Sequence, residues 1–536
     1  MEPNTLYYGD NLPVLRDREH FPDACVDLIY LDPPFNSNRS YNVLFKETGG
    51  AANPAQIEAF EDTWHWGSPA EEAFRDVAHS GSDTARLLNA MVEALGRNDV
   101  TAYLCMMAVR LVELRRVLKP TGSIYLHCDP TASHYLKVLM DSIFGPSNFR
   151  NEITWQRTNV HNDAKRWGTV ADTILYYGKT AEVVWNQPRV RLTDAHLASK
   201  YTHDDGDGRG LYMLDNMTSP NPRPNMMYEW KGHASPPYGW RYSRETMARL
   251  DSEGRVWYPL STAKRPQLKR YLNEMAGSAM NSIWTDIAPI NSQARERLGY
   301  ATQKPLALLE RIIQASSNPG DTVLDPFCGC GTAVHAAQRL GRRWLGIDIT
   351  FLAIGLIERR LRDAFPTVDF KEVGVPADLP GATALAARDP YQFQWWACHL
   401  LGAVPQGGVK KKGADKGVDG TIPFIEGATN LKRVIVSVKA GHIEPAYVQQ
   451  LKGVMEGQGA PIGVLVTLRE PTRAMRTEAV SAGSYHSDFW NRDYPRIQLI
   501  TASELLAGKR VEMPPQVSPF SQAARETERG EQTTLI

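Results

Sequence analysis

Between a strand-like segment, 322–324, and a helix expected over 333–340, the sequence reads Asp325-Pro326-Phe327-Cys328-Gly329-Cys330-Gly331-Thr332. Gly329 and Gly331 have no side chain, so this stretch can turn tightly and its backbone can come close to a ligand. Open α/β sheets bind their ligands beyond the carboxyl ends of the strands, where strand-to-helix turns of this kind lie. The pattern therefore predicts an α/β fold with a cofactor loop at this point.

A second strand, expected over 343–348, follows that helix and ends in Asp348. A carboxylate at this position can accept hydrogen bonds from both hydroxyls of a ribose. The alternative is a nicotinamide dinucleotide site. The third glycine of that fingerprint is missing at its usual spacing, however, and Asp325-Pro326-Phe327 is not part of it. The sequence therefore favours adenosine without a pyrophosphate.

A second motif, Asp32-Pro33-Pro34-Phe35, follows an apolar, β-rich segment at 25–31. The two prolines fix φ at consecutive positions and hold Asp32 in an extended backbone, which predicts a rigid turn at the end of a strand. An exocyclic amine of a base is a poor nucleophile, because its lone pair is delocalised into the ring. The Asp32 carboxylate and the Pro33 carbonyl can accept its hydrogens, and Phe35 offers an apolar face for stacking. A proline-containing turn without a function is the alternative.

The two motifs, in this order, resemble those of the DNA amino-methyltransferases that use S-adenosylmethionine, in their permuted β-type arrangement. In that arrangement the catalytic Asp-Pro-Pro-Phe/Tyr half comes first and the Phe-x-Gly-x-Gly cofactor half comes last. The resemblance runs from Leu6 to Arg362 and includes four further segments. These are Gly9-Asp10, residues 116–129, residues 149–155, and Thr302-Gln303-Lys304-Pro305 followed by a helix to Ser317.

The resemblance implies a Rossmann-like methyltransferase sheet that forms from a catalytic half, 1–184, and a cofactor-binding half, 296–365, with a target-recognition region inserted at 185–295. It also implies that a base of double-stranded DNA is flipped into the pocket, where the sulfonium methyl is transferred directly and without a metal. The implied catalytic residues are Asp32, Pro33, Pro34 and Phe35. The implied cofactor-binding residues are Asp10, Lys304, Asp325, Pro326, Phe327, Gly329, Gly331, Thr332 and Asp348.

The target base follows from the first residue of the catalytic motif. In the family, Asp at this position leans toward adenine N6 and Ser toward cytosine N4, so Asp32 favours adenine, and cytosine N4 is the alternative. Two other classes of protein compete with this hypothesis: a DNA-binding regulator with a vestigial methyltransferase half, and a methyltransferase of RNA or of protein glutamine. The intact motifs argue against the first, and the permuted order argues against the second.

The inserted region is rich in Gly, Pro, Trp and Tyr and has neither a helical nor a strand period, so we expect it to be loop-rich. Aromatic and basic residues suit groove reading and base stacking. The chain has 60 Lys and Arg against 60 Asp and Glu, so phosphate contacts must be local. Candidates are the basic segment 264–271 and Arg157 with Lys165, Arg166 and Trp167. A solvated surface is the alternative for each.

At 536 residues the chain is long enough for two or three domains. No apolar run approaches the roughly 20 residues that span a bilayer. The N-terminus also lacks the order of a signal peptide, so we expect a cytoplasmic protein. The six cysteines form no Cys-x-x-Cys pair, and we expect reduced thiols, with Cys328 and Cys330 as small residues of the cofactor loop. Dimers occur in the family, so a second copy and a restriction subunit are the partners to consider besides DNA.

After a Pro/Ala/Gly-rich linker at 366–389, a new α/β pattern covers 390–512, and a tail at 513–536 is expected to be disordered. The pattern has a helix at 391–401 and strands at 433–439 and 462–468. It resembles the Mrr-like branch of restriction-endonuclease folds, which cut phosphodiesters with an acidic residue on one strand and a Glu/Gln-x-Lys on the next.

Asp419 and Lys439 match this nuclease pattern as a metal ligand and a charge-stabilising lysine. Ser437 does not match, because a hydroxyl is a poor Mg²⁺ ligand beside a carboxylate. Three hypotheses remain open. The domain is a working Mg²⁺-dependent nuclease, with another acid such as Glu444 in place of Ser437; or it is a degenerate nuclease fold kept for DNA binding; or Asp419 merely lies in a glycine turn and Lys439 on an exposed strand edge.

Overall fold

The computed structural model describes residues 2–34, 40–43, 57–61, 66–79, 81–159, 167–190, 194–275, 277–291, 294, 296–298, 300, 302–406, 417–427, 430–517 and 526. It divides into two compact units, one of Met1–Asn186 with Ser282–Arg529 and one that contains Gln187–Asn281. Phe35 lies outside the described residues, as do Lys165, Arg166 and most of the tail at 513–536.

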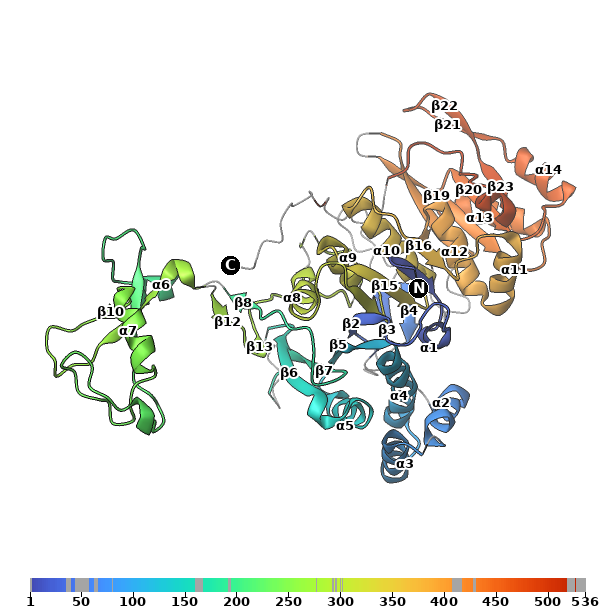
Figure 1. The fold of residues 1–536 in the computed structure, drawn as a ribbon. Helices are drawn as coiled ribbons and strands as arrows, with labels where there is room; N and C mark the ends of the chain where they lie inside the picture. Colours follow the sequence, from blue (N-terminus) through green and yellow to red (C-terminus); the bar gives the residue numbers. More distant parts are fainter. Residues whose placement is uncertain are drawn as a thin grey trace. The chain divides into compact units, whose positions relative to one another are not determined.

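A nine-stranded sheet forms the centre of the larger unit (Figure 1). Only β7 is antiparallel to its neighbours, and all other adjacent pairs are parallel. This mainly parallel sheet confirms the expected Rossmann-like α/β class. In spatial order the strands are β13 (Ile283–Trp284), β6 (Phe149–Gln156), β7 (Ala171–Gly178), β5 (Leu118–Cys128), β2 (Val26–Leu31), β14 (Thr322–Asp325), β15 (Arg343–Asp348), β1 (Thr5–Tyr8) and β16 (Lys371–Val373).

Strands β2 and β14 are neighbours in the sheet, although they come from the two different halves that the sequence predicts. Leu28 pairs with Val323, and Ile29 pairs with Leu324, in parallel register. Parallel neighbours end at the same edge of a sheet. The Asp-Pro-Pro turn after β2 and the glycine loop after β14 therefore lie together at one edge.

Helices cover both faces of this sheet, because side chains alternate along each strand. Leu28 and Tyr30 of β2 pack into one buried cluster, and Ile29 and Leu31 pack into another. The first cluster includes α8 (Leu306–Ser316), α9 (Thr332–Arg339) and α10 (Phe351–Ala364). The second includes α1 (Asn11–Arg16), α2 (Ser68–Ala78), α3 (Asp83–Leu95), α4 (Asp99–Val117) and α5 (Ser133–Phe144).

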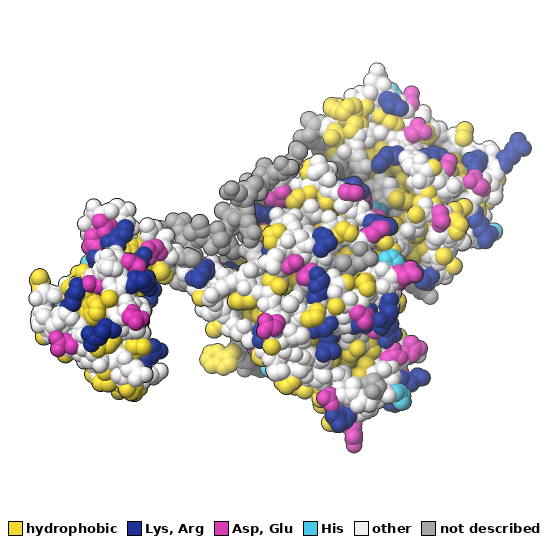
Figure 2. Space-filling model, viewed as in Figure 1, with side chains coloured by type: hydrophobic (Ala, Val, Ile, Leu, Met, Phe, Trp, Pro, Cys, Tyr) yellow, Lys and Arg dark blue, Asp and Glu magenta, His cyan; other side chains and the backbone are white. Residues whose placement is uncertain are grey.

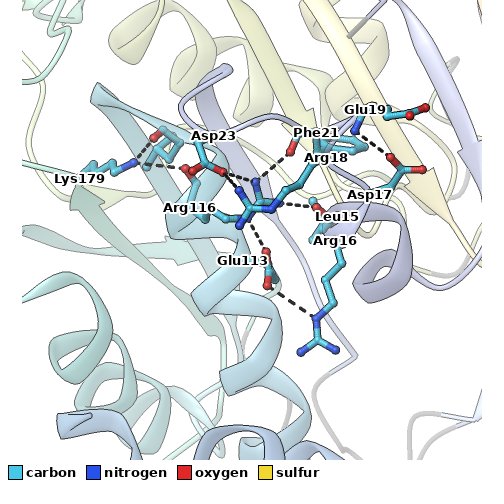
Figure 3. A network of polar contacts seen from close by, with 11 residues as sticks. Leu15, Arg16, Asp17, Arg18, Glu19, Phe21, Asp23, Glu113, Arg116 and Lys179 are labelled. Atoms are coloured by element: carbon cyan, nitrogen blue, oxygen red, sulfur yellow. Dashed lines mark hydrogen bonds and ion pairs between the residues drawn. The ribbon is translucent and has the colours of Figure 1, made fainter. Parts of the chain in front are cut away.

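Arg116, near the end of α4, ties the connection between α1 and β2 to that helix (Figure 3). Its guanidinium donates to the carbonyls of Leu15 (2.5 Å) and Phe21 (2.9 Å). It also pairs with the carboxylates of Glu113 (2.6 Å) and Asp23 (2.7 Å). Five donors in a rigid fork allow one arginine to hold several acceptors at once. The start of β2, the strand that leads to Asp32, is thereby fixed against the α4 layer.

The C-terminal part of the larger unit contains a second, five-stranded sheet (Figure 1). Its strands are β17 (Val404–Pro405), β18 (Gly420–Ile425), β19 (Leu431–Lys439), β20 (Ile462–Thr467) and β23 (Ile497–Thr501), in that order. The helices of this part are α12 (Pro390–Leu401), α13 (Ala446–Gly457), α14 (Arg473–Ser481) and α15 (Ala502–Leu506), and β21 (Ser484–Ser487) pairs with β22 (Arg492–Pro495).

The segment 366–389, expected as a linker, is a structured connection. It contains β16, which joins the large sheet, and α11 (Leu379–Arg388), whose Ala382 and Leu385 are buried. These apolar side chains belong to one cluster that extends from Ile357 of α10 to Trp396 of α12 and on into the five-stranded sheet. The two sheets of this unit therefore share a continuous hydrophobic core.

Polar contacts join the same two parts close to the cofactor loop. The Gln392 side chain accepts a hydrogen bond from the backbone N–H of Phe351, at the start of α10 (3.1 Å). His399 Nε2 lies 2.9 Å from a carboxylate oxygen of Glu358. A Cβ at Gly355 would lie 2.5 Å from the His399 ring, so only glycine permits this approach of α12 to α10.

The unit that contains Gln187–Asn281 has more regular structure than the loop-rich region that the sequence predicts. Besides a helix, α7 (Arg244–Ser252), it has a small sheet whose strands β10 (Val256–Trp257), β11 (Gln267–Tyr271) and β9 (Tyr212–Asn216) are in this order. The core of this unit is made of Met217, Trp240, Met247, Leu250, Val256 and Leu268. The remaining elements are α6 (Asp194–Lys200) and a pair of strands, β8 (Arg189–Val190) and β12 (Ser278–Ala279).

Acidic and basic side chains are interspersed on the face that Figure 2 shows, in keeping with the zero net charge. Within the basic segment 264–271, Lys269 pairs with Asp205 (2.5 Å) and Arg270 with Asp215 (2.7 Å), which reduces the charge available to a phosphate. Among the described helices, none has both the length and the apolar character needed to cross a bilayer.

Candidate active site

The carboxyl ends of β1, β2, β14 and β15 surround a cavity of about 440 Å³. This is the edge of an open α/β sheet where ligands are expected to bind. Pro33 lies in the turn after β2 and Gly331 at the start of α9, next to the cavity. Of the residues predicted from the sequence, the cavity is lined by Asp10, Asp32, Pro34, Lys304, Asp325, Pro326, Phe327, Gly329, Thr332 and Asp348.

Asp32 has one carboxylate oxygen paired and one for which the described residues supply no hydrogen-bond partner. The ammonium of Lys304 lies 2.5 Å from Oδ2. Oδ1 is buried and has no hydrogen-bond partner among the described residues. A buried acceptor left without a partner costs about 1–3 kcal/mol, so a ligand that brings an N–H to Oδ1 recovers this energy. The site is therefore complementary to a donor such as an amine.

The glycine loop between β14 and α9 requires its glycines. Gly329 has φ +52° and Gly331 has φ +73°, in the left-handed region that side chains disfavour. A Cβ at Gly329 would lie 3.1 Å from the Tyr300 ring, and one at Gly331 would lie 2.8 Å from Cγ1 of Ile357. The loop thus places bare backbone against the cavity on one side and against α10 on the other.

Asp348, at the end of β15, is held by the loop that it faces. Its Oδ2 accepts from the backbone N–H of Gly329 (2.9 Å), and its Oδ1 accepts from the backbone N–H of Thr350 (2.9 Å). Burial nevertheless raises the pKa of Asp348 to about 6. The carboxylate is therefore fixed in direction and ionised at neutral pH, as an acceptor for two hydroxyls must be.

Asp325 differs from Asp348 in its protonation. Burial, together with the nearby carboxylates of Asp32 and Asp348, raises the pKa of Asp325 to about 8. One oxygen accepts from the N–H of Phe327 (3.0 Å). Near pH 7 this carboxyl is largely protonated, so it can donate a hydrogen bond into the cavity. Near pH 7 Asp348 is thus an ionised acceptor, whereas Asp325 is an acid.

Arg110 is a site residue that the sequence analysis does not single out. From α4, its guanidinium donates to Asp10 Oδ1 (2.8 Å) and to Asn11 Oδ1 (2.6 Å). Asn11 in turn donates to the carbonyl of Pro326 (2.8 Å). This bridge fixes the turn after β1 against the loop after β14. The sequence does contain a signal for Arg110, because it is a single arginine within the apolar segment 104–112. A buried arginine needs hydrogen-bond acceptors nearby.

Cys328 and Cys330 are buried free thiols in the loop. Burial raises the pKa of both, so they are protonated at neutral pH. The described residues contain no group of three or more His, Cys, Asp or Glu side chains that could hold a metal ion.

In the C-terminal sheet, two of the three predicted nuclease-like residues, Asp419 and Ser437, are in contact. Asp419, at the start of β18, accepts through Oδ2 from the backbone N–H of Val438 (2.7 Å) and from the hydroxyl of Ser437 (3.2 Å). Lys439 lies with its ammonium 5.3 Å from the centre of the Tyr447 ring. One oxygen of Asp419 is thus engaged by the protein itself, and the second carboxylate of the cleavage pattern is replaced by the serine hydroxyl.

A family model described as "DNA methylase", for N6 and N4 methyltransferases, matches residues 26–354. A second, described as "NACHT-associated inactive Restriction Endonuclease 1", matches residues 406–507. The type II methyltransferase M.EcaI of Enterobacter cloacae is 34% identical and aligns over 67% of this chain and 69% of its own. The type III StyLTI Mod subunit of Salmonella typhimurium is 26% identical, and this chain spans only half of its length: the alignment covers 63% of this chain and 50% of the Mod subunit.

Solved structures of DNA methyltransferases align with the same part of the chain. A complex of M1.HpyAVI with S-adenosylmethionine is 15% identical, over 67% of this chain and 98% of that one, with a TM-score of 0.32. The cytosine-N4-specific PvuII DNA methyltransferase is 14% identical, over 68% and 87%, with a TM-score of 0.31.

Proposed function

The chain belongs to the DNA methylase family of N6 and N4 methyltransferases, and from this premise we propose that it methylates the exocyclic N6 amine of adenine in double-stranded DNA. The observation that carries the proposal is Asp32 Oδ1, a buried acceptor at the cavity for which the described residues supply no donor. An amine is the group that such an acceptor selects. Asp at this first motif position favours adenine over cytosine.

The methyl donor that we assign is S-adenosyl-L-methionine, and the residues of the cavity fit it. Asp348 offers a fixed carboxylate to the two ribose hydroxyls, and Gly329 leaves open the space that a side chain would fill. Asp10, held by Arg110, is the acidic residue assigned to the adenine. When bound, this cofactor supplies an electrophilic methyl group on a sulfonium sulfur.

The protein's own part in the reaction is to position and activate the amine. Asp32 Oδ1 accepts one amine hydrogen, and the Pro33 carbonyl is assigned to the other. Lys304 pairs with Oδ2 and holds the Asp32 carboxylate in a fixed direction. Both acceptors draw the nitrogen lone pair out of conjugation with the ring. Holding the amine in this geometry in a water-poor cavity supplies most of the expected acceleration.

A duplex buries this amine among stacked bases, so the target nucleotide has to leave the helix. Extrusion costs a few kcal/mol. Contacts of the protein to the displaced base and to the DNA backbone must offset this cost. We assign the recognition of the DNA to 187–281 and the stacking of the flipped base to Phe35. The residue roles and the division into 1–184, 185–295 and 296–365 remain predictions.

The experiment is to incubate the protein with isotope-labelled S-adenosyl-L-methionine and plasmid DNA, digest the DNA to nucleosides and separate them by chromatography with mass detection. We expect the label in N6-methyladenine. Label in N4-methylcytosine would replace adenine by cytosine and leave the methyltransferase assignment intact. Unlabelled DNA, with cofactor binding demonstrated by calorimetry, would contradict the proposal as a whole.

For the C-terminal sheet, we propose a nuclease fold that no longer cuts DNA. The engagement of Asp419 by Val438 and Ser437, and the match to an inactive restriction endonuclease family, support this. We expect no Mg²⁺-dependent cleavage of methylated or unmethylated plasmid by the purified chain. Cleavage that disappears in Lys439→Ala would restore the active-nuclease hypothesis.

We further propose that the methylation serves a restriction–modification system, because the aligned relatives are named as enzymes of such systems. A partner restriction subunit or a second copy of the chain would then bind the protein. Affinity purification of the tagged chain from its host, with mass spectrometry and light scattering, distinguishes these assemblies from a monomer.

A further inference from the structure

Two long loops leave the small sheet of the smaller unit at the same end. The last residues of β9 and β10 are Asn216 and Trp257, and both pair with Gln267, the first residue of β11. In antiparallel pairs the end of one strand lies beside the start of the next. The loops 217–243 and 258–266 therefore emerge side by side, and we call them together the loop end.

The two loops of the loop end pack on each other. His233 Nδ1 lies 2.8 Å from the carbonyl of Lys264, and Trp230 Nε1 donates to the hydroxyl of Tyr258 (2.9 Å). Trp240 is fully buried beneath them in the core of the unit. Seven prolines in the two loops restrict the backbone further. The loop end is thus a preformed surface, and a ligand that binds it has little loop ordering to offset.

Basic side chains outnumber acidic ones at the loop end. Its five cations and one carboxylate are Arg223, Lys231, Arg241, Lys264, Arg265 and Glu229. Lys231 pairs with Asp251 (2.5 Å), and Arg241 lies 3.8 Å from Asp215. The other three cations are exposed and have no carboxylate partner among the described residues. The loop end therefore carries positive charge that the protein does not neutralise.

The opposite end of the small sheet also carries several cations, but carboxylates neutralise them. The chain enters β9 and leaves β11 there, and the N–H of Leu272 donates to the carbonyl of Leu211 (2.9 Å). We call it the paired end, because three of its arginines have carboxylate partners: Arg209 with Asp207 (2.5 Å), Arg249 with Glu253 (2.9 Å) and Arg255 with Glu274 (2.5 Å). The two ends thus differ in available charge, although both contain arginines.

Duplex DNA is the partner that the charge of the loop end fits. It presents one negative charge for about every 1.7 Å of helix, and each cation that neutralises a phosphate releases a counterion. Exposed cations without carboxylate partners can make such contacts directly, whereas the paired arginines would first have to give up their partners.

Arg223 has the surroundings of a residue that reads a base. It stands between Pro222 and Pro224, which restrict the backbone on both sides, and its N–H donates to the carbonyl of Tyr238 (3.0 Å). A planar guanidinium can donate two parallel hydrogen bonds to the edge of a guanine. A firmly held backbone suits this contact, because two simultaneous hydrogen bonds require a defined direction.

We propose that the loop end is the surface of this unit that binds duplex DNA, with Lys264 and Arg265 on phosphates and Arg223 on a base edge as a specificity-determining residue. This rests on the proposed function, which assigns the recognition of DNA to 187–281. Phosphate contacts position the protein on the duplex, and the base contact selects the sequence. The paired end takes no part in DNA binding.

The first test measures the affinity of the full chain for a short fluorescent DNA duplex by anisotropy, between about 50 and 200 mM KCl. In the double variant Lys264→Ala/Arg265→Ala, the slope of log affinity against log salt concentration should become shallower by about 1.8, which is about 0.9 for each lost phosphate contact. An unchanged slope would overturn the proposal and leave an acidic protein as the occupant of the loop end.

Two further variants control this test. Arg249→Ala/Arg255→Ala removes two charges from the paired end, and its slope should equal that of the wild type; an equal change in both double variants would overturn the proposal. Lys264→Arg/Arg265→Lys keeps both charges and should bind as the wild type does. If it binds as weakly as the alanine variant, phosphate contact by these two charges is refuted.

The second test concerns sequence specificity. Sequencing of DNA methylated by the wild type gives the recognised site, and duplexes with one base pair of that site changed in turn serve as competitors. Arg223→Ala should lower the preference in kcat/KM for the correct base pair at one position, roughly 5- to 150-fold. Arg223→Lys should lose the same preference, because it keeps the charge but not the planar fork. An unchanged preference at every position would refute the role of Arg223.

The two tests separate this inference from the proposed function. If the wild type labels no DNA, but its binding to a duplex depends on Lys264 and Arg265, the proposed function fails and the DNA-binding surface stands. If the wild type labels DNA and both loop-end variants behave as the wild type, only this inference fails.

Discussion

Gly331→Ala probes how closely the cofactor loop packs on α10. Gly331 begins α9 with φ +73°, and an added Cβ would lie 2.8 Å from Cγ1 and 3.1 Å from Cγ2 of Ile357. The left-handed backbone costs an alanine about 1–2 kcal/mol. Crowding of a packed core by one methyl adds about 1–3 kcal/mol. Together we expect a loss of about 2–5 kcal/mol in the free energy of unfolding.

Gly341→Ala is the matched control, because only the cost of the left-handed backbone applies to it. Gly341 has φ +69°, and nothing lies within 4 Å of its added Cβ. The two variants should therefore differ by about 1–3 kcal/mol in the free energy of unfolding, measured in urea by tryptophan fluorescence. S-adenosyl-L-methionine should bind more weakly to Gly331→Ala, because the loop must shift to relieve the contact, and normally to Gly341→Ala.

Ile357→Ala removes Cγ1 and Cγ2, the two carbon atoms nearest to the added Cβ, and completes the test. On its own it costs about 2–5 kcal/mol through the cavity that it leaves. In the Gly331→Ala background it should cost less, because the new methyl occupies part of that space. Equal losses in Gly331→Ala and Gly341→Ala, or wild-type cofactor affinity in both, would refute the role assigned to this packing.

Three further predictions concern the active site and the shared core. Asp32→Ala should reduce DNA methylation roughly 10²–10³-fold, which is the effect of removing a group that stabilises developing charge. Calorimetry should show an unchanged affinity for the cofactor. Loss of cofactor binding would contradict the role assigned to Asp32. Because the pKa of Asp325 is raised in the folded protein from 3.8 to about 8, its contribution to stability is fully present below about pH 4 and is lost as the pH rises toward 8. Asp325→Asn does not titrate. Between pH 5 and pH 9 the free energy of unfolding of the variant, measured in urea, should therefore rise relative to that of the wild type. If the free energy of unfolding depends on pH in the same way in both proteins, the raised pKa of Asp325 is refuted. Residues 1–366 produced alone should aggregate in size-exclusion chromatography, whereas residues 1–517 should remain soluble; a soluble short fragment with native cofactor affinity would disprove the shared core.

The sequence predicts those helices and strands that a local sequence pattern specifies. The strand at 343–348 and the strand and helix around the glycine loop are present, since apolar β-rich runs and paired glycines specify them directly. The helix expected at 391–401 is α12, and the strand expected at 433–439 is within β19. The helix α7 is not predicted, because only Met247 and Leu250 mark its buried face among polar neighbours.

The features that the sequence does not predict are those that depend on which strands become neighbours in the sheet. His127 and Asp172 meet because β5 and β7 pair antiparallel in one register, and a shift by one residue would turn each to the opposite face. Arg110 reaches Asp10 only once α4 lies against β1 and β2. The linker expected at 366–389 is structured for the same reason: Ala382 and Leu385 are apolar positions whose partners lie elsewhere in the chain.

The shared core has a consequence for how such a chain can be inherited. Domains that recombine freely usually meet at an exposed linker that few contacts cross. Here a genetic exchange between residues 366 and 390 would separate Ile357 from Trp396 and leave an apolar surface on both products. The nuclease-like part therefore does not behave as an independent, exchangeable domain, and we expect its loss to destabilise the methyltransferase part. Selection for DNA modification alone can preserve this part long after any cutting has ceased.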